Sequence, residues 1–241
     1  MMRRFGLWLT IMLIFVGAIQ AQDDTLSFET VELSASDDLT LIADYYTPDD
    51  MTDSAPAVIL LHMLNSNRQA YEPLIPSLVD AGYVVLNVDM RGHGDTGGSN
   101  DWDLAIEDTQ LWFNWLREQE IVDDSQIAII GASIGSNVAL IACDNDSDCV
   151  TAIALSPGID YRGVQPADSI ANGLNTLLIA SHSDGQSASA IRQFFADATG
   201  YVSTRMYLGS AHGTRLFRNE LDSVSGAILD WLDEQFSAVA M

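Results

Sequence analysis

The sequence of 241 residues contains no lysine, and its ten basic residues, all arginines, stand against 34 acidic residues. The formal net charge is therefore −24, and a surface this negative repels nucleic-acid phosphates and anionic lipid. No nucleic-acid partner is expected. The chain also lacks internal repeats, low-complexity linkers and breaks in composition, which indicates a single domain. Its 48% of hydrophobic residues can build a large core, so the sequence is not that of a disordered chain.

The N-terminus has the composition of a secretory signal peptide. Arg3 and Arg4 precede an apolar run over residues 5–19, and a polar Gln22-Asp23-Asp24 segment follows. A run of this length is too short for a membrane span, which needs about 20 residues. We therefore predict a signal peptide over residues 1–21, cleaved after Ala18 or Ala21, and an exported domain over residues 22–241 with no stable membrane insertion after cleavage. An uncleaved anchor is the alternative.

Cysteine is scarce, because only Cys143 and Cys149 occur, on either side of an Asp-Asn-Asp-Ser-Asp stretch. An exported protein meets oxidising conditions, so we predict a disulfide between them, with two free thiols as the alternative. The alternating Asp144, Asp146 and Asp148 resemble the start of a calcium loop, but the glycine and the distant glutamate of that loop are absent. A solvated loop without a metal is expected here.

The hydrophobic pattern changes once along the chain. Residues 26–33 and 39–46 alternate between apolar and polar side chains, which predicts an antiparallel hairpin. Continuous apolar runs follow, as in strands buried on both faces of a parallel sheet, with helical patterns between most of them. An α/β domain with a mostly parallel central sheet and helices on both faces is predicted. The expected strands are 57–61, 83–88, 127–130, 150–155, 176–180 and 201–208, and the expected helices are 69–81, 102–118, 134–142, 187–198 and 219–236.

The sharpest motif is Gly131-Ala132-Ser133-Ile134-Gly135, between the strand at 127–130 and a helix. A serine on a tight strand-to-helix turn needs small neighbours, because the backbone is strained and other chain segments come close. The helix that follows directs its N-terminus at the same place, where negative charge is stabilised. Ser133 is the candidate nucleophile.

A serine hydroxyl needs a base to accept its proton, and the chain offers only four histidines. With a nucleophile on such a turn, the expected chain order is serine, acid, histidine, which rules out His62 and His93. His212, directly after the last predicted strand, is the preferred base. His182 is the alternative, although it lies at the end of a strand and precedes the best acid by two residues.

The acid of the set orients the imidazole and stabilises its charged form. Asp184, at the tip of the strand over 176–180, is the preferred residue. Asp160, one strand earlier, is the main competitor, and Asp197, on a predicted helix, is the weakest.

Backbone amides should bind the oxyanion that forms during acyl transfer. The amide of Ile134 directly follows the nucleophile, and the amide of Met63 follows the strand at 57–61, so we choose these two. The His62 side chain is expected to be structural, and the Arg91-Gly92-His93-Gly94 turn is expected to stabilise its loop.

Taken in order, these motifs resemble the α/β-hydrolase superfamily, and in particular its compact dienelactone-hydrolase-like and prolyl-oligopeptidase-like branches. The resemblance implies a Ser–Asp–His hydrolase of carboxylic esters, thioesters or amides that needs no metal or other cofactor. Three departures stand out: Met63 replaces a frequent glycine, Ala132 replaces an aromatic residue or histidine, and Ser181 replaces a glycine before the acid. The segments that carry the resemblance are Leu61-His62-Met63, residues 89–94, residues 131–135, Ser183-Asp184 and Ala211-His212-Gly213.

Only 20 residues separate the strands at 150–155 and 176–180, where many relatives insert a helical lid. An open site suits small or exposed acyl groups better than long lipid chains, since little apolar wall would cover them. The expected function is hydrolysis of such a small-molecule acyl substrate. An acyltransferase with the same three residues and a non-catalytic binding protein on the same fold are the alternatives.

Overall fold

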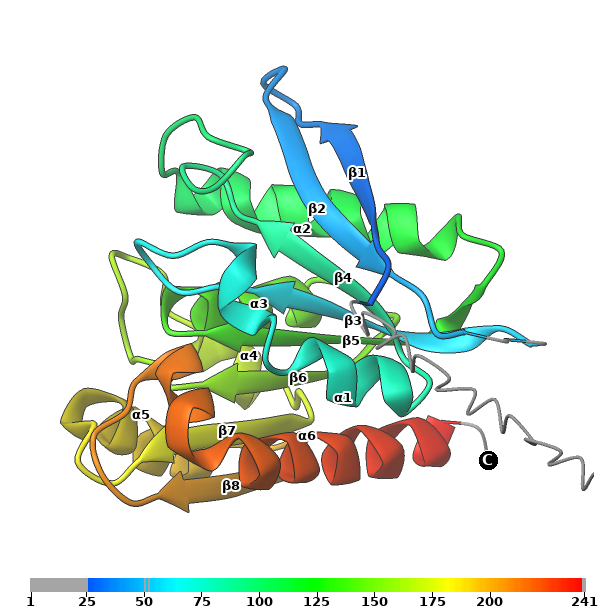
Figure 1. Cartoon of the computed structure of the whole chain (residues 1–241). Coiled ribbons are helices and arrows are strands. Elements are labelled where there is room, and N and C mark those ends of the chain that lie inside the picture. The colour runs from blue at the N-terminus through cyan, green and yellow to red at the C-terminus, as the bar shows by residue number, and fades with distance from the viewer. Residues whose placement is uncertain (1–25, 50, 52, 240–241) are drawn as a thin grey trace, which may run out of the picture.

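The computed structural model describes residues 26–49, 51 and 53–239. The predicted signal peptide and its two candidate cleavage sites lie outside them. The described residues form one eight-stranded sheet with strand order β1-β2-β4-β3-β5-β6-β7-β8, shown in Figure 1. The strands are β1 (Glu29–Ser34), β2 (Thr40–Tyr46), β3 (Ala55–Leu61), β4 (Val84–Asp89), β5 (Val122–Ala132), β6 (Cys149–Leu155), β7 (Thr176–Ser181) and β8 (Val202–Tyr207).

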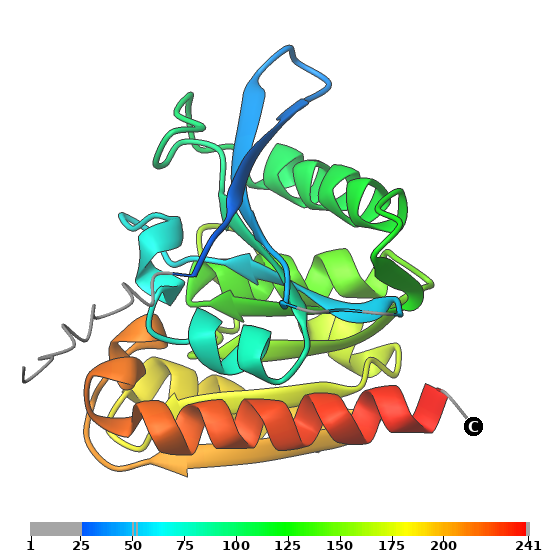
Figure 2. The same cartoon turned by 45° about the vertical axis from the view of Figure 1, so that its right-hand side comes forward.

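The sheet is antiparallel at its N-terminal edge and parallel elsewhere, which confirms the predicted fold class. β1 and β2 form the predicted hairpin, and β2 also pairs antiparallel with β4. All other neighbours are parallel. The central strands are buried along nearly their whole length, as their unbroken apolar runs require. The hairpin stands out from the body of the sheet because the strands twist strongly, as Figure 2 shows.

Helices cover both faces of the sheet and enclose two cores. α1 (Ile75–Asp80) and α6 (Phe217–Val239) pack on one face, in front of the sheet in Figure 1. The opposite face carries α2 (Trp102–Arg117), α3 (Ile134–Asp144), α4 (Ala167–Ala171) and α5 (Gly185–Asp197). No helix in the described part of the chain has the length and apolar content needed to cross a membrane.

The strand order reverses at β3. The chain passes from β3 to β4 on one side, and then from β4 back across β3 to β5 on the other side. In open α/β sheets, ligands bind beyond the carboxyl ends of the strands at such a reversal. We therefore expect a binding site at the carboxyl ends of β3 and β5, which point to the left in Figure 1.

The predicted helix over 69–81 is wrong. The structure divides this stretch into a short 3-10 helix, η1 (Arg68–Tyr71), and α1. Pro73 lies between them and lacks the amide hydrogen that a continuous helix needs, whereas Pro76 is tolerated in the first turn of α1. The strand predicted over 127–130 is longer than expected and begins at Val122. Between β6 and β7 only the five-residue α4 occurs, in keeping with the expected lack of a large lid.

Candidate active site

Ser133 lies on the turn between β5 and α3, at the reversal point. Its backbone φ of 53° falls in the left-handed region, which a residue other than glycine adopts only under strain. Its amide donates to Leu155 O of β6 at 2.8 Å, which ties the turn to the neighbouring strand. The predicted serine turn is therefore present in the structure, with the hydroxyl-bearing residue in a strained conformation.

The two flanking glycines are required by close packing. A Cβ on Gly131 would lie 2.1 Å from Gly135 O, and a Cβ on Gly135 would lie 2.4 Å from His62 O. Both distances are too short for any side chain. Gly135 thus allows the first turn of α3 to approach the end of β3, which brings the loop after β3 close to Ser133.

His212 and Asp184 complete a continuous hydrogen-bonded set with Ser133. His212 Nε2 lies 2.8 Å from Ser133 Oγ, and His212 Nδ1 lies 2.7 Å from Asp184 Oδ2. A carboxylate can only accept, so Nδ1 carries the hydrogen and Nε2 is free to accept the serine proton. The histidine side chain is 27% exposed and the aspartate 11% exposed, so solvent reaches the base while the acid is nearly buried.

The alternative residues do not take part in this set. The Asp160 carboxylate accepts from the Gly163 amide and from Gln165 within its own exposed loop. These two hydrogen bonds lower the pKa of Asp160, the Gly163 amide having the larger effect. His182 is exposed, and Asp197 is an exposed residue at the end of α5. The structure therefore brings together Ser133, Asp184 and His212, and leaves the three alternatives apart.

The amides chosen for the oxyanion are both free of protein acceptors among the described residues. Ile134 begins α3, so its N–H belongs to the unpaired first turn of an 11-residue helix. Met63 follows β3, and its sulfur lies 3.7 Å from Thr214 Oγ1, on the turn after His212. Two unpaired amides thus lie near the carboxyl ends of β3 and β5, the latter being the strand that leads into the Ser133 turn.

His62 has the expected structural position and is fully buried. Its Nδ1 donates to Met63 O at 2.9 Å and its Nε2 accepts from the Met90 amide at 3.1 Å. Because one contact needs a donor and the other an acceptor, the ring must be neutral. Burial lowers the pKa of His62 to about 4. The Met63 carbonyl, near the start of the loop after β3, is thereby held in place.

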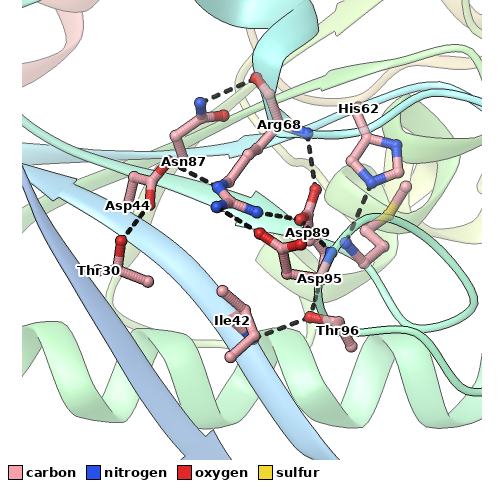
Figure 3. A network of polar contacts seen from close by, with 10 residues as sticks. Thr30, Ile42, Asp44, His62, Arg68, Asn87, Asp89, Asp95 and Thr96 are labelled. Atoms are coloured by element: carbon pink, nitrogen blue, oxygen red, sulfur yellow. Dashed lines mark hydrogen bonds and ion pairs between the residues drawn. The ribbon is translucent and has the colours of Figure 1, made fainter.

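An ion-pair network around the buried Arg68 anchors the far end of the same loop, and Figure 3 shows it. Arg68 donates from its guanidinium to Asp44 of β2, Asp89 of β4 and Asp95 of the following loop. Its carbonyl accepts from Asn87 at 2.9 Å. Burial disfavours the guanidinium charge, but the hydrogen bonds to Asp44 and Asp95 outweigh this and raise the pKa of Arg68. The loop from β3 to η1 is therefore fixed at both ends.

Arg91 stabilises the next loop, as expected for the Arg91–Gly94 turn. It is buried and donates to Asp108 of α2 at 2.7 and 2.8 Å, and also to Asp37 of the β1–β2 turn. His93 Nδ1 contacts Arg91 O at 3.1 Å, which holds the turn internally. None of these side chains reaches the serine, so the turn acts on the structure of the loop.

The predicted disulfide is present and joins Cys143, near the end of α3, to Cys149, at the start of β6. Asp146, between them, forms an ion pair with Arg117 instead of contributing to a metal site. Within residues 26–239, apart from the two undescribed positions, no group of three His, Cys, Asp or Glu side chains is arranged to bind a metal. An open hollow of about 640 Å³ beside the disulfide lies at the amino ends of the strands, opposite the serine.

Comparison with known proteins identifies the family. The profile of the family described as "Serine aminopeptidase, S33" matches residues 52–212, which is more than half of the chain. The chain belongs to this family. It is thereby a member of the α/β-hydrolase superfamily, which confirms the predicted relationship.

The relatives that this S33-family chain matches in sequence include a protein named a transferase and one whose name states no activity. The polyketide transferase grgF of Penicillium sp is 32% identical over 144 residues, covering 58% of this chain and 48% of the relative. The protein YfhR of Escherichia coli O157:H7 is 29% identical over 136 residues, covering 55% and 48%. The chain thus matches about half the length of these relatives.

Solved structures share the fold of this S33-family chain. The esterase Pf2001 of Pyrococcus furiosus superposes with a TM-score of 0.76 at 20% identity, covering 92% of this chain and 95% of the esterase. The structure of DcsB with its substrate analogue superposes with a TM-score of 0.78 at 16% identity, covering 87% and 100%. At these identities the likeness concerns the fold alone.

Several residues around the site carry no signal in the sequence that singles them out. Arg68 carried no local signal, because its partners are 21 to 27 positions away. Tyr161 was also missed: its ring centroid lies 6.3 Å from that of His212, and its hydroxyl contacts Ser156 O and Ser187 Oγ. Burial raises the pKa of Tyr161. Only the apolar context of the loop at 156–164 could have pointed to this residue.

Proposed function

We propose that this S33-family member is a serine hydrolase that cleaves carboxylic esters of small or exposed acyl groups. The observation that carries the proposal is the unbroken hydrogen-bonded set from Ser133 through His212 to Asp184, with distances of 2.8 and 2.7 Å. Such a set activates a serine for acyl transfer. The strained turn under Ser133 supports the same assignment, because strain of this kind concentrates at functional sites.

The proposed reaction has two steps. Ser133 Oγ attacks the acyl carbonyl and His212 Nε2 takes its proton, so that a tetrahedral oxyanion forms between the amides of Met63 and Ile134. The C–O bond to the leaving alcohol then breaks, and the alcohol receives the proton from His212. In the second step a water gives its proton to His212 and attacks the acyl-enzyme, and the acid leaves as Ser133 regains the proton. Asp184 stabilises the charged imidazole in both steps.

Fluorophosphonate labelling tests the nucleophile. We expect one label on Ser133, lost in Ser133→Ala and strongly reduced in His212→Ala, and hydrolysis of short p-nitrophenyl esters that depends on the same residues. A loss of about 10³-fold or more is expected for Ser133→Ala. The exposed His182 supplies a control, since His182→Ala should retain the activity. A folded protein that takes no label, or a Ser133→Ala variant within about tenfold of the parent, would refute the proposal.

Acyl transfer to an alcohol is the second candidate. The relative named a polyketide transferase, at 32% identity, is the observation that favours it. The same acyl-enzyme would form, and an alcohol would replace water in the second step. Product analysis with added alcohols separates transfer from hydrolysis. Transfer is indicated if the new ester replaces the acid as the alcohol concentration rises while the sum of both products stays constant. Hydrolysis is indicated if only the acid forms.

We also propose that the enzyme works outside the cytoplasm. The basic and apolar N-terminus and the disulfide between Cys143 and Cys149 support this location. Expression of the full chain, followed by fractionation and mass measurement, tests it. A mature protein starting at residue 19 or 22 in the exported fraction is expected, and a full-length protein in the cytoplasm would contradict it.

A further inference from the structure

His212 lies on a segment that has no regular structure of its own. Residues 208–212 connect β8 to the 3-10 helix η2 (Gly213–Leu216), and Leu208, Gly209 and Ser210 are exposed. A base that must meet a serine within hydrogen-bonding distance cannot move freely. Two of the contacts that hold this segment come from buried serine hydroxyls, one at the end of β7 and one directly after β6.

Ser181, the last residue of β7, holds the residue before His212. Its side chain is fully buried, and its Oγ donates to Ala211 O at 2.8 Å. Its carbonyl accepts from the Asp184 amide at 3.1 Å. One residue thus contacts both the segment that carries the base and the segment that carries the acid.

Ser156, directly after β6, holds the residue after His212. Its Oγ accepts from the Gly213 amide at 2.9 Å, and the side chain is fully buried. Its φ of 57° is in the left-handed region, as for Ser133 on the adjacent strand. The strain is balanced by hydrogen bonds from its amide to Ile179 O and from Tyr161 to its carbonyl. A strained, buried residue that is held in place this firmly points to a function.

We infer that Ser156 and Ser181 are positioning residues that clamp the backbone on both sides of His212. The inference rests on the proposed function. Neither hydroxyl contacts the reacting atoms, so both act through the position of the imidazole. Loss of either hydroxyl lets the segment at 208–213 shift, and a shift of about 1 Å at a catalytic group lowers the rate while substrate binding remains.

Alanine and glycine variants test the clamp. We expect Ser156→Ala and Ser181→Ala each to lower kcat and the fluorophosphonate inactivation rate about tenfold or more, with KM within about twofold. Ser156→Gly should lower kcat and the inactivation rate as much as Ser156→Ala, since glycine relieves the left-handed strain but supplies no hydroxyl. The matched control is Ser225→Ala, which removes a buried hydroxyl whose one hydrogen bond among the described residues is to Asp222 O within α6.

If Ser156 and Ser181 only stabilised the fold, the measurements on their variants would differ. The melting temperature would fall while kcat and the pH dependence of inactivation stayed those of the parent, and the inference would then be overturned. A clamp instead changes the shape of that pH profile, because the hydrogen bond between His212 and Asp184 is altered. Ser181→Thr, which keeps a hydroxyl, should recover part of the rate lost in Ser181→Ala.

Hydrogen exchange separates failure of the clamp from failure of the proposed function. A parent protein that resists fluorophosphonate refutes the proposed function. The clamp is then decided by the Gly213 amide, which we expect to exchange slowly in the parent because it donates to Ser156 Oγ. Faster exchange at Gly213 in Ser156→Ala, with Ser225→Ala unchanged, supports the clamp. Equal exchange in all three proteins overturns it.

Discussion

Arg68 bonds Asp89 twice, once from its guanidinium and once from its backbone amide at 2.7 Å. The aspartate ends β4, whereas the arginine begins η1, after the loop that leaves β3. Figure 3 shows both contacts, which tie the end of the loop after β3 to the neighbouring strand β4. Both side chains are almost fully buried, so water cannot solvate either charge if its partner is removed.

Removal of the Arg68 charge should destabilise the protein strongly. Arg68→Met leaves Asp44 and Asp89 buried without their counter-ion, and we expect a loss of about 3–5 kcal/mol in the free energy of unfolding. Urea unfolding measures it. Arg192→Met on the exposed side of α5 is the matched control and should stay within about 0.5 kcal/mol of the parent. A loss below about 1 kcal/mol for Arg68→Met would show that the network contributes little.

The free energy of unfolding should decrease as the pH is lowered, because His62 titrates. The unfolded histidine has its ordinary pKa of about 6.5, and burial lowers the pKa in the folded protein to about 4. Between these values the unfolded chain binds a proton that the folded protein does not, so stability is full above pH 6.5 and falls as the pH decreases to 4. The shift corresponds to about 3 kcal/mol.

The His62→Gln variant isolates this effect. We expect its unfolding free energy to depend less on pH over the same window, and the difference between parent and variant to change by about 3 kcal/mol. His93, whose ring lies 4.9 Å away, and Asp89 face His62 and remain in both proteins. His182→Gln, an exposed substitution, should follow the parent curve. Parallel curves for the parent and His62→Gln would contradict the prediction.

Two glycine-to-alanine substitutions should have opposite effects. In Gly135→Ala the new methyl would lie 2.4 Å from His62 O and 2.5 Å from Leu61 O, so α3 must move away from β3. We expect a loss of about 1–3 kcal/mol and a marked fall in activity. A methyl on Gly226, within α6, would meet no atom within 4 Å, so Gly226→Ala should stabilise the helix by about 0.5–1 kcal/mol. Thermal unfolding of both variants checks the contrast, and an equally tolerated Gly135→Ala would contradict it.

Reduction of the disulfide should affect stability more than chemistry. Cys143 and Cys149 close a loop with a sequence separation of 6, for which chain entropy gives about 2 kcal/mol. The bond lies toward the end of α3 remote from Ser133, so kcat should change by less than about twofold. Thermal unfolding with and without reductant, and of the double variant Cys143→Ser/Cys149→Ser, measures the first effect. A reductant response that persists in the double variant would exclude the disulfide as its cause.

The sequence predicted the fold where the signal was local. Continuous apolar runs gave the parallel strands, and alternation gave the hairpin, because burial on one or both faces of a sheet constrains neighbouring residues directly. The helix expected over 69–81 is divided into η1 and α1, because Pro73 lacks the amide hydrogen that a continuous helix needs.

The sequence by itself determined the serine on its glycine-flanked turn, and the candidate partners that follow it. Motif spacing and chain order suffice for this, since a strand-to-helix turn needs its small residues nearby in the sequence. Only the tertiary structure decided that Asp184 and not Asp160 meets His212, that Arg68 meets three aspartates, and that Ser156 and Ser181 flank the histidine. These contacts join different strands and loops, and their geometry follows from the order of strands in the sheet, which no local pattern encodes.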